Sequence, residues 1–203
     1  MTSCPACRAE VQEPGPCALC AHLSTVWSSV QVGGVFDVSP TCIGVDPSRT
    51  ACGVVAVDGF GVKGGDVFRT KAGQRHETRV NEIARAAAGF VYDHVEHSSS
   101  VIFIEANFVG PNPQGDLLNR ELIGALRLDL WRAGHQIHMV NNKAGKKALT
   151  GSGKSGKVQM VEAALKFPGF ASKVDGPKYY LEAVADSLGV LLAGATKWEG
   201  DDG

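Results

Sequence analysis

The chain has 203 residues, 44% of them hydrophobic and 20% charged, which is enough for one ordinary core and a small appendage. No stretch reaches the roughly 18 consecutive apolar residues that a membrane span requires, and the N-terminus lacks the features of a signal peptide, so we expect a soluble cytoplasmic protein with no membrane partner. The formal net charge of −1 excludes a general attraction to polyanions, so any binding of that kind must come from local clusters of charge.

The N-terminus is rich in cysteine and proline. Its four cysteines form two Cys-x2-Cys turns, namely Cys4, Cys7, Cys17 and Cys20. Two such turns can direct four thiolates at one tetrahedral zinc ion, and so short a segment cannot fold by apolar burial alone. We therefore predict a zinc-binding module with one structural zinc over residues 1–23 and a linker over 24–40. Disulfides and an iron–sulfur cluster are the alternatives.

A single domain is predicted from residue 41 onward. It begins with three apolar runs in hairpin spacing, over residues 42–46, 51–57 and 62–68. Amphipathic spacing then predicts helices, and further apolar runs predict strands, in the order helix 77–97, strand 101–105, helix 116–133, strand 136–140, helix 155–166 and helix 179–196. The order βββαβαβαα predicts a mixed five-stranded sheet flanked by helices, as in α/β proteins of the RNase H-like type.

Carboxylates occur where the chemistry of such a sheet is expected. Asp46 ends the first strand and Glu105 ends the fourth, so both should emerge at the same carboxyl edge of the sheet. Glu182 and Asp186 are four residues apart and share one face of the last helix. Each acid could instead be solvated, and Asp46 before Pro47 is a common turn opening. Four carboxylates without basic partners in their motifs nevertheless favour divalent metal.

Oxygen ligands of this kind suit Mg²⁺ or Mn²⁺ rather than zinc. Two such ions about 4 Å apart can activate a water molecule and stabilise the leaving oxygen in phosphodiester hydrolysis. Phosphoryl transfer by two metal ions is therefore the predicted reaction class.

A basic segment precedes the last two predicted helices. It has no acidic residue and contains five lysines: Lys143, Lys146, Lys147, Lys154 and Lys157. We interpret it as a loop that binds the backbone phosphates of DNA. Within it, residues 148–155 fit a relaxed phosphate-binding pattern, so a P-loop nucleotide-binding protein is an alternative. Against that reading, Val140, the end of the preceding strand, is eight residues before Ala148.

Four motifs in this order resemble the RuvC family of Holliday-junction resolvases. They are Ile43-Gly44-Val45-Asp46-Pro47-Ser48, Glu105-Ala106-Asn107-Phe108, the basic segment from Lys146 to Met160, and Ala185-Asp186-Ser187-Leu188. Together they extend over residues 42 to about 195. The resemblance implies a homodimer, from a bacterium or a phage, that cuts four-way junctions and possibly forks and flaps.

The resemblance also implies roles for individual residues. Asp46, Glu105, Asp186 and one further acid would hold the catalytic metal ions, and Lys157 would contact the scissile phosphate. Phe108, in a Pro/Gly-rich loop, would project toward unstacked bases, the alternative being a place in the core. Lys143, Lys146, Lys147 and Lys154 would contact the DNA backbone.

The chain departs from the family pattern in its last helix. Two helix acids three residues apart are usual in the family, which would place the first at position 183, where this chain has alanine. Glu182, one position earlier, is the expected substitute, and Asp175 is its rival. A non-enzymatic alternative remains: an inactive zinc-ribbon adaptor that only binds DNA.

Overall fold

The computed structural model describes residues 41–48, 50–71, 73–95, 100–106 and 113–198, together with the backbone of two short N-terminal strands, β1 (Thr2–Ser3) and β2 (Glu10–Val11). These two strands pair antiparallel. Within the range 113–198, the side chains of residues 113–116, 118 and 198 are not described. The predicted zinc ligands Cys4, Cys7, Cys17 and Cys20, the predicted linker and Phe108 all lie outside the described residues, so their roles stay predictions.

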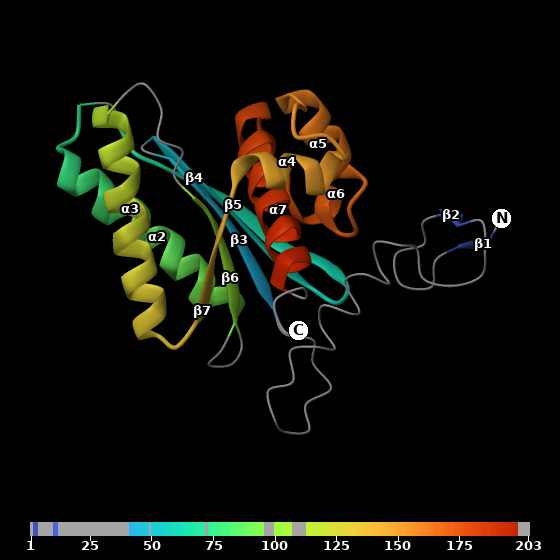
Figure 1. Ribbon diagram of the computed structural model, residues 1–203, viewed down its shortest axis with the longest axis horizontal. Coiled ribbons are helices and arrows are strands. Elements are labelled where there is room, and N and C mark those ends of the chain that lie inside the picture. The colour runs from blue at the N-terminus through green and yellow to red at the C-terminus, as the bar shows by residue number, and fades with distance from the viewer. Residues whose placement is uncertain are drawn as a thin grey trace.

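A mixed sheet of five strands forms the centre of the domain (Figure 1). Its strands are β3 (Cys42–Pro47), β4 (Ala51–Asp58), β5 (Gly61–Arg69), β6 (Val101–Glu105) and β7 (Gln136–Val140). They lie in the order β5-β4-β3-β6-β7, with β3, β4 and β5 forming an antiparallel meander and β6 and β7 running parallel to β3. The predicted sheet is therefore confirmed.

Helices cover both faces of this sheet (Figure 1). One face packs against α2 (His76–His94) and α3 (Pro113–Arg132), and the other against α6 (Phe170–Lys173) and α7 (Lys178–Trp198). Helices α4 (Asn142–Thr150) and α5 (Lys157–Leu165) lie on the same side and pack against α7. Alternating side chains on each strand supply the two cores. On β3, for example, Ile43 and Val45 pack toward α2 and α3, whereas Cys42 packs toward α7.

Cys42 and Cys52 are both buried. No helix in the described part of the chain is long and apolar enough to cross a membrane.

The prediction of a loop across the basic segment was wrong, because Asn142–Thr150 forms α4. Asn141 caps this helix, its side chain accepting a hydrogen bond from the Lys143 backbone N–H at 2.9 Å, and Gly151 ends it with a φ of 81°. The high density of lysine obscured the helix, whose buried contact is made by a glycine, Gly145, against Gly189 of α7. The short helix α6 was not predicted either.

Helix α7 packs unusually close to the sheet. A Cβ atom placed on Gly44 of β3 would overlap the Ser187 carbonyl oxygen, and one on Gly53 of β4 would lie 2.5 Å from the Ala183 carbonyl oxygen. Only glycine leaves room for this approach. The close packing fixes the helix backbone on both sides of Asp186 against the strands that carry and neighbour Asp46.

Candidate active site

Three of the predicted acids come together on the face of the sheet that α7 covers. Asp46 of β3 directly follows Val45, which pairs with Ile104, so Asp46 lies beside Glu105 at the ends of two parallel strands. The alternation of side chains places both acids on the same face as Gly44 and Phe103, which contact α7. Asp186 projects from α7 into this region and is buried.

Burial and mutual repulsion perturb the two strand carboxyls. Burial, the charges of Glu105 and Asp186, and a hydrogen bond shared with Glu105 raise the pKa of Asp46 to about 8. Burial also raises the pKa of Glu105, although a hydrogen bond from Asn142 acts in the opposite direction. Without a cation, the region therefore favours a proton on this pair at neutral pH, and a bound cation would remove the cost of ionising both.

Lys157 supplies the positive charge that the protein itself places in this region. Its Nζ forms a hydrogen-bonded ion pair with Asp186 Oδ2. Burial lowers the pKa of Lys157, but the hydrogen bond and charge of Asp186, followed by the charges of Asp46 and Glu182, outweigh it and raise that pKa. The other oxygen of Asp186, Oδ1, is buried and makes no hydrogen bond with the described part of the chain. An unpartnered buried carboxylate oxygen is costly, so it is available for a ligand.

Asn142 is a site residue that the sequence analysis missed. Its Nδ2 donates a hydrogen bond to Glu105 Oε1 at 2.9 Å. The available signal was the pair of asparagines directly after β7. Asn141 caps α4, and Asn142 is then free to reach Glu105 at the end of the neighbouring strand β6. The bond fixes the orientation of the Glu105 carboxylate.

The structure distinguishes the two rivals for the fourth acid. Glu182 lies one turn before Asp186 on α7, is largely buried, and contributes to the charge that acts on Lys157. Its Oε1 also lies 3.8 Å from Lys178 Nζ. Asp175 is exposed in the turn before α7, and no described group of the site has its pKa shifted by it. Glu182 is therefore the better candidate.

A divalent ion fits the donors, although the side chains are not arranged around one. Among the described residues, no three Asp, Glu, His or Cys side chains form a group that could hold a metal ion as they stand. In this arrangement Lys157 pairs with Asp186, and Asp46 shares a hydrogen bond with Glu105. The oxygen donors and the free Oδ1 of Asp186 are the chemistry that Mg²⁺ or Mn²⁺ prefers.

The other basic residues lie around this cluster rather than within it. Lys143, Lys146 and Lys147 are on α4, and Lys154 is exposed in the turn that follows. Lys146 is close enough to lower the pKa of Glu105. The lysines thus form a basic surface beside the carboxylates.

This arrangement does not match a P-loop. The glycine-rich stretch after Gly151 follows the end of α4 rather than a strand, and α4 separates it from β7. A phosphate-binding loop should connect a strand directly to a helix.

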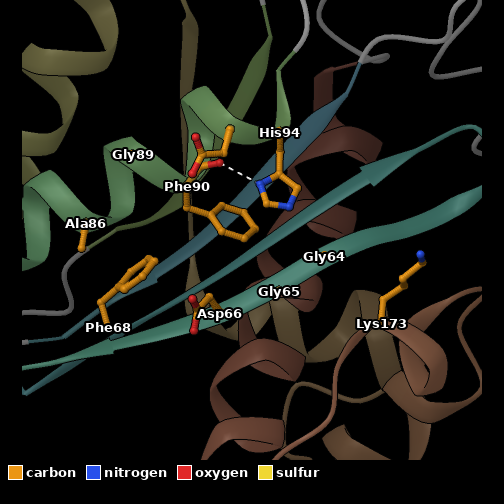
Figure 2. A pocket seen from close by; sticks show the side chains of 10 residues that line it. Gly64, Gly65, Asp66, Phe68, Ala86, Gly89, Phe90, His94 and Lys173 are labelled. Atoms are coloured by element: carbon orange, nitrogen blue, oxygen red, sulfur yellow. Dashed lines mark hydrogen bonds between the residues drawn. The ribbon is translucent and has the colours of Figure 1, made fainter.

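A separate shallow pocket lies at the outer edge of β5, between α2 and α6 (Figure 2). His94 stacks on Phe90 with ring centres 4.0 Å apart, and its Nδ1 contacts the Phe90 carbonyl oxygen at 2.9 Å. Asp66 accepts a hydrogen bond from the Val67 backbone N–H at 2.6 Å. Local structure already uses these polar groups, and the pocket contains none of the predicted site residues.

Comparison with known proteins identifies related sequences. Residues 42–176 match the family model described as crossover junction endodeoxyribonuclease RuvC. This segment contains Asp46, Glu105 and Lys157, and it ends before Glu182 and Asp186. The RuvC crossover junction endodeoxyribonuclease of Corynebacterium jeikeium is 27% identical over 157 residues, which is 74% of this chain and 90% of the relative. That of Sphingopyxis alaskensis is 29% identical over 75% of this chain and 95% of the relative.

Solved structures share the fold. Thermus thermophilus RuvC in complex with a Holliday junction substrate superimposes with a TM-score of 0.63 at 19% identity, over 79% of this chain and 96% of that one. The yeast mitochondrial Holliday junction resolvase Ydc2 superimposes with a TM-score of 0.52 at 11% identity, over 88% of this chain and 86% of that one.

Proposed function

This chain belongs to the RuvC family of crossover junction endodeoxyribonucleases. On that premise we propose that it resolves Holliday junctions by hydrolysing phosphodiester bonds of the DNA, with Asp46, Glu105 and Asp186 forming the catalytic site. The observation that carries the proposal is the convergence of these three acids, with the pKa of Asp46 raised to about 8 and one oxygen of Asp186 unpartnered. A cluster of acids whose full ionisation is unfavourable without a cation is suited to binding cations and to the reaction of a phosphate ester.

Asp46, Glu105, Asp186 and Glu182 would hold Mg²⁺ or Mn²⁺, most simply as a pair of ions. When bound, such ions activate the attacking water and stabilise the leaving oxygen of the cleaved bond. Asn142 keeps the Glu105 carboxylate oriented through its 2.9 Å hydrogen bond, so that Glu105 does not have to be ordered when the ions bind. The glycine contacts of α7 do the same for Asp186 through the helix backbone.

Lys157 would contact the scissile phosphate. Without DNA, its ammonium group pairs with Asp186 and its side chain is about half exposed. If a phosphate oxygen replaced Asp186 as the partner of this ammonium group, the positive charge of Lys157 would stay paired. The exposed lysines at positions 143, 147 and 154, together with the half-buried Lys146, would bind neighbouring backbone phosphates without reading sequence. Phe108, from the segment after β6, would stack on an unpaired base near the branch point.

The N-terminal cysteines would form a structural module outside the catalytic domain. We propose that Cys4, Cys7, Cys17 and Cys20 bind one zinc ion, since four thiolates make a closed soft site. The active form would be a homodimer that acts on forks and flaps as well as on four-way junctions, in the cytoplasm of a bacterium or of a phage-infected cell.

Two other functions are less well supported. Nucleotide hydrolysis is disfavoured because α4 lies between β7 and the glycine-rich stretch. A purely DNA-binding adaptor would have no need of three converging acids, whose repulsion destabilises the fold. Release of inorganic phosphate from ATP would support the first, and junction binding without any nicking would support the second.

The experiment that tests the proposal compares labelled four-way, three-way and linear DNAs of matched sequence. With Mg²⁺ or Mn²⁺ we expect paired nicks near the branch point of the four-way junction and little cutting of linear duplex, and with EDTA no cutting. Equal cutting of all three DNAs, or cutting in EDTA, would contradict the proposal.

A further inference from the structure

Arg69 and Tyr179 form an exposed pair that the proposed catalytic site does not include. Arg69 is the last residue of β5, and Tyr179 lies in the first turn of α7. The guanidinium carbon of Arg69 is 4.6 Å from the centre of the Tyr179 ring. Tyr179 is 49% exposed and Arg69 is exposed as well. Both side chains are therefore accessible to a partner.

The sheet places Arg69 near the catalytic acids. Asp46 pairs with Gly53 and Gly53 with Val67, and Arg69 lies two residues beyond Val67 toward the same edge. With strands about 4.8 Å apart and a rise of about 3.4 Å per residue, Arg69 and Asp46 are separated by about 12 Å. Val67 packs against the core under α7, and alternate residues share a face, so Arg69 projects on the side of α7.

The geometry of helix α7 independently places Tyr179, the partner of Arg69, near the catalytic acids. Tyr179, Glu182 and Asp186 are three and four residues apart in turn, so they lie along one stripe of the helix. The rise of 1.5 Å per residue puts Tyr179 about 10 Å from Asp186 along the axis. Helix α4, which carries three lysines, packs against α7 at Gly189. Basic groups thus flank Asp186 in both directions along α7.

The chemistry of the pair suits a phosphate. Within the described part of the chain, Arg69 forms no ion pair with a carboxylate, and its charge is in contact only with the Tyr179 ring. An aromatic ring restricts a guanidinium without using its N–H donors, which stay free for bidentate hydrogen bonds to phosphate oxygens. Tyr180 anchors the helix start, its hydroxyl donating to the Gly65 carbonyl oxygen at 2.6 Å.

We propose that Arg69, positioned by Tyr179, binds a backbone phosphate about two nucleotides from the phosphodiester bond that is cut. The spacing follows from the separation of about 10–12 Å. Each nucleotide of a duplex strand advances about 3.4 Å along the helix axis and also winds around it, so this separation spans about two phosphates. The inference rests on the proposed function, because it uses the catalytic acids to define where the DNA lies. It assigns Arg69 to a phosphate on the side of the site away from α4.

The first test measures junction affinity in EDTA as a function of salt. Arg69→Ala should bind a four-way junction about three- to tenfold more weakly, with the slope of log K against log salt reduced by about one. Tyr179→Phe should bind like the wild type because the ring remains, whereas Tyr179→Ala should lose part of the affinity. Arg132→Ala and Tyr92→Ala are the matched controls, because both residues are exposed at the opposite end of the sheet. All variants should retain the unfolding temperature of the wild type to within a few degrees.

The second test locates the phosphate with a series of junctions that each carry one neutral methylphosphonate linkage. A neutral linkage about two nucleotides from the cut should weaken binding by the wild type and have no further effect on Arg69→Ala. The proposal is overturned if Arg69→Ala matches the wild type in affinity and salt slope, or if every neutral linkage costs both proteins equally. If the wild type itself neither binds nor cuts junctions, the proposed function fails. This outcome is read from the wild type alone, so it is distinct from a failure of the Arg69 proposal, which is read from the variants.

Discussion

Replacing Asp46 with asparagine should stabilise the metal-free protein, by an amount that grows with pH. The Asp46 carboxyl has a pKa of about 8 in the folded chain, against about 3.9 when unfolded. A pKa that is higher in the folded than in the unfolded state means that ionisation of the acid destabilises the folded state relative to the unfolded state. The native state should therefore lose stability as pH rises from about 4 to about 8, and the uncharged asparagine should not.

The magnitude follows from the size of the shift. At pH 7 the acid is about three pH units above its unfolded pKa, and about 1.4 kcal/mol per unit gives a ceiling of about 4 kcal/mol. Because Asp46 shares its proton with Glu105, removing one acid lets the other ionise, and we expect about 2–3 kcal/mol to be recovered. For a domain of this size that corresponds to a rise of about 5–10 °C in melting temperature.

The assay is thermal unfolding of both proteins in EDTA at pH values from 4.5 to 8.5. The two melting temperatures should be similar at the acid end and diverge toward the alkaline end. Adding Mg²⁺ at pH 8 should raise the melting temperature of the wild type more than that of the variant, because the ion binds the ionised acids of the native state. A difference that does not change with pH would refute the assignment of this destabilisation to Asp46.

Three further predictions concern other parts of the chain. Gly53→Ala should cost about 1–3 kcal/mol and lower kcat, because the new methyl group would displace α7 near Asp186, whereas Gly89→Ala on α2, where a Cβ meets nothing, should be neutral or stabilising in the same unfolding and cleavage assays. Replacing three of the five lysines of the basic segment, Lys146, Lys147 and Lys154, together by alanine should weaken junction binding and lower its salt slope by about two to three. An unchanged slope would mean that these lysines are only solvated. Purified protein should carry about one zinc ion per chain by elemental analysis and lose it when Cys4 and Cys7 become serine; oxidised cysteines without zinc would exclude the module.

The fold could be predicted in detail because its elements follow simple periodicities. The apolar runs that end at Asp46 and Glu105 have the length of buried strands. Their parallel pairing follows because the meander leaves β5 running in the same direction as β3, and α2 then crosses over from β5 to β6. The ends of most predicted helices and strands lie within about three residues of those observed. The short helix α6 was missed, since its four residues are too few to show a period.

The site could be predicted only where the acids directly end strands. Asp46 and Glu105 are brought together by sheet register, which the sequence pattern encodes. The approach of α7 depends on Gly44 and Gly53, whose role is visible only when the two elements are packed. The bond from Asn142 to Glu105 and the pairing of Lys157 with Asp186 are tertiary contacts between segments 37 and 29 residues apart in the chain, so local periodicity does not reveal them.

The central claim is that the cluster of Asp46, Glu105 and Asp186 cuts branched DNA. The most direct measurement is single-turnover cleavage of a labelled four-way junction in Mg²⁺ by the wild type and by Asp46→Asn, with junction binding by both proteins measured in EDTA. We predict paired cuts by the wild type, and for the variant a rate at least about a hundredfold lower with binding retained, because the lost carboxylate holds metal rather than DNA. Cleavage by Asp46→Asn at the rate of the wild type would contradict the account.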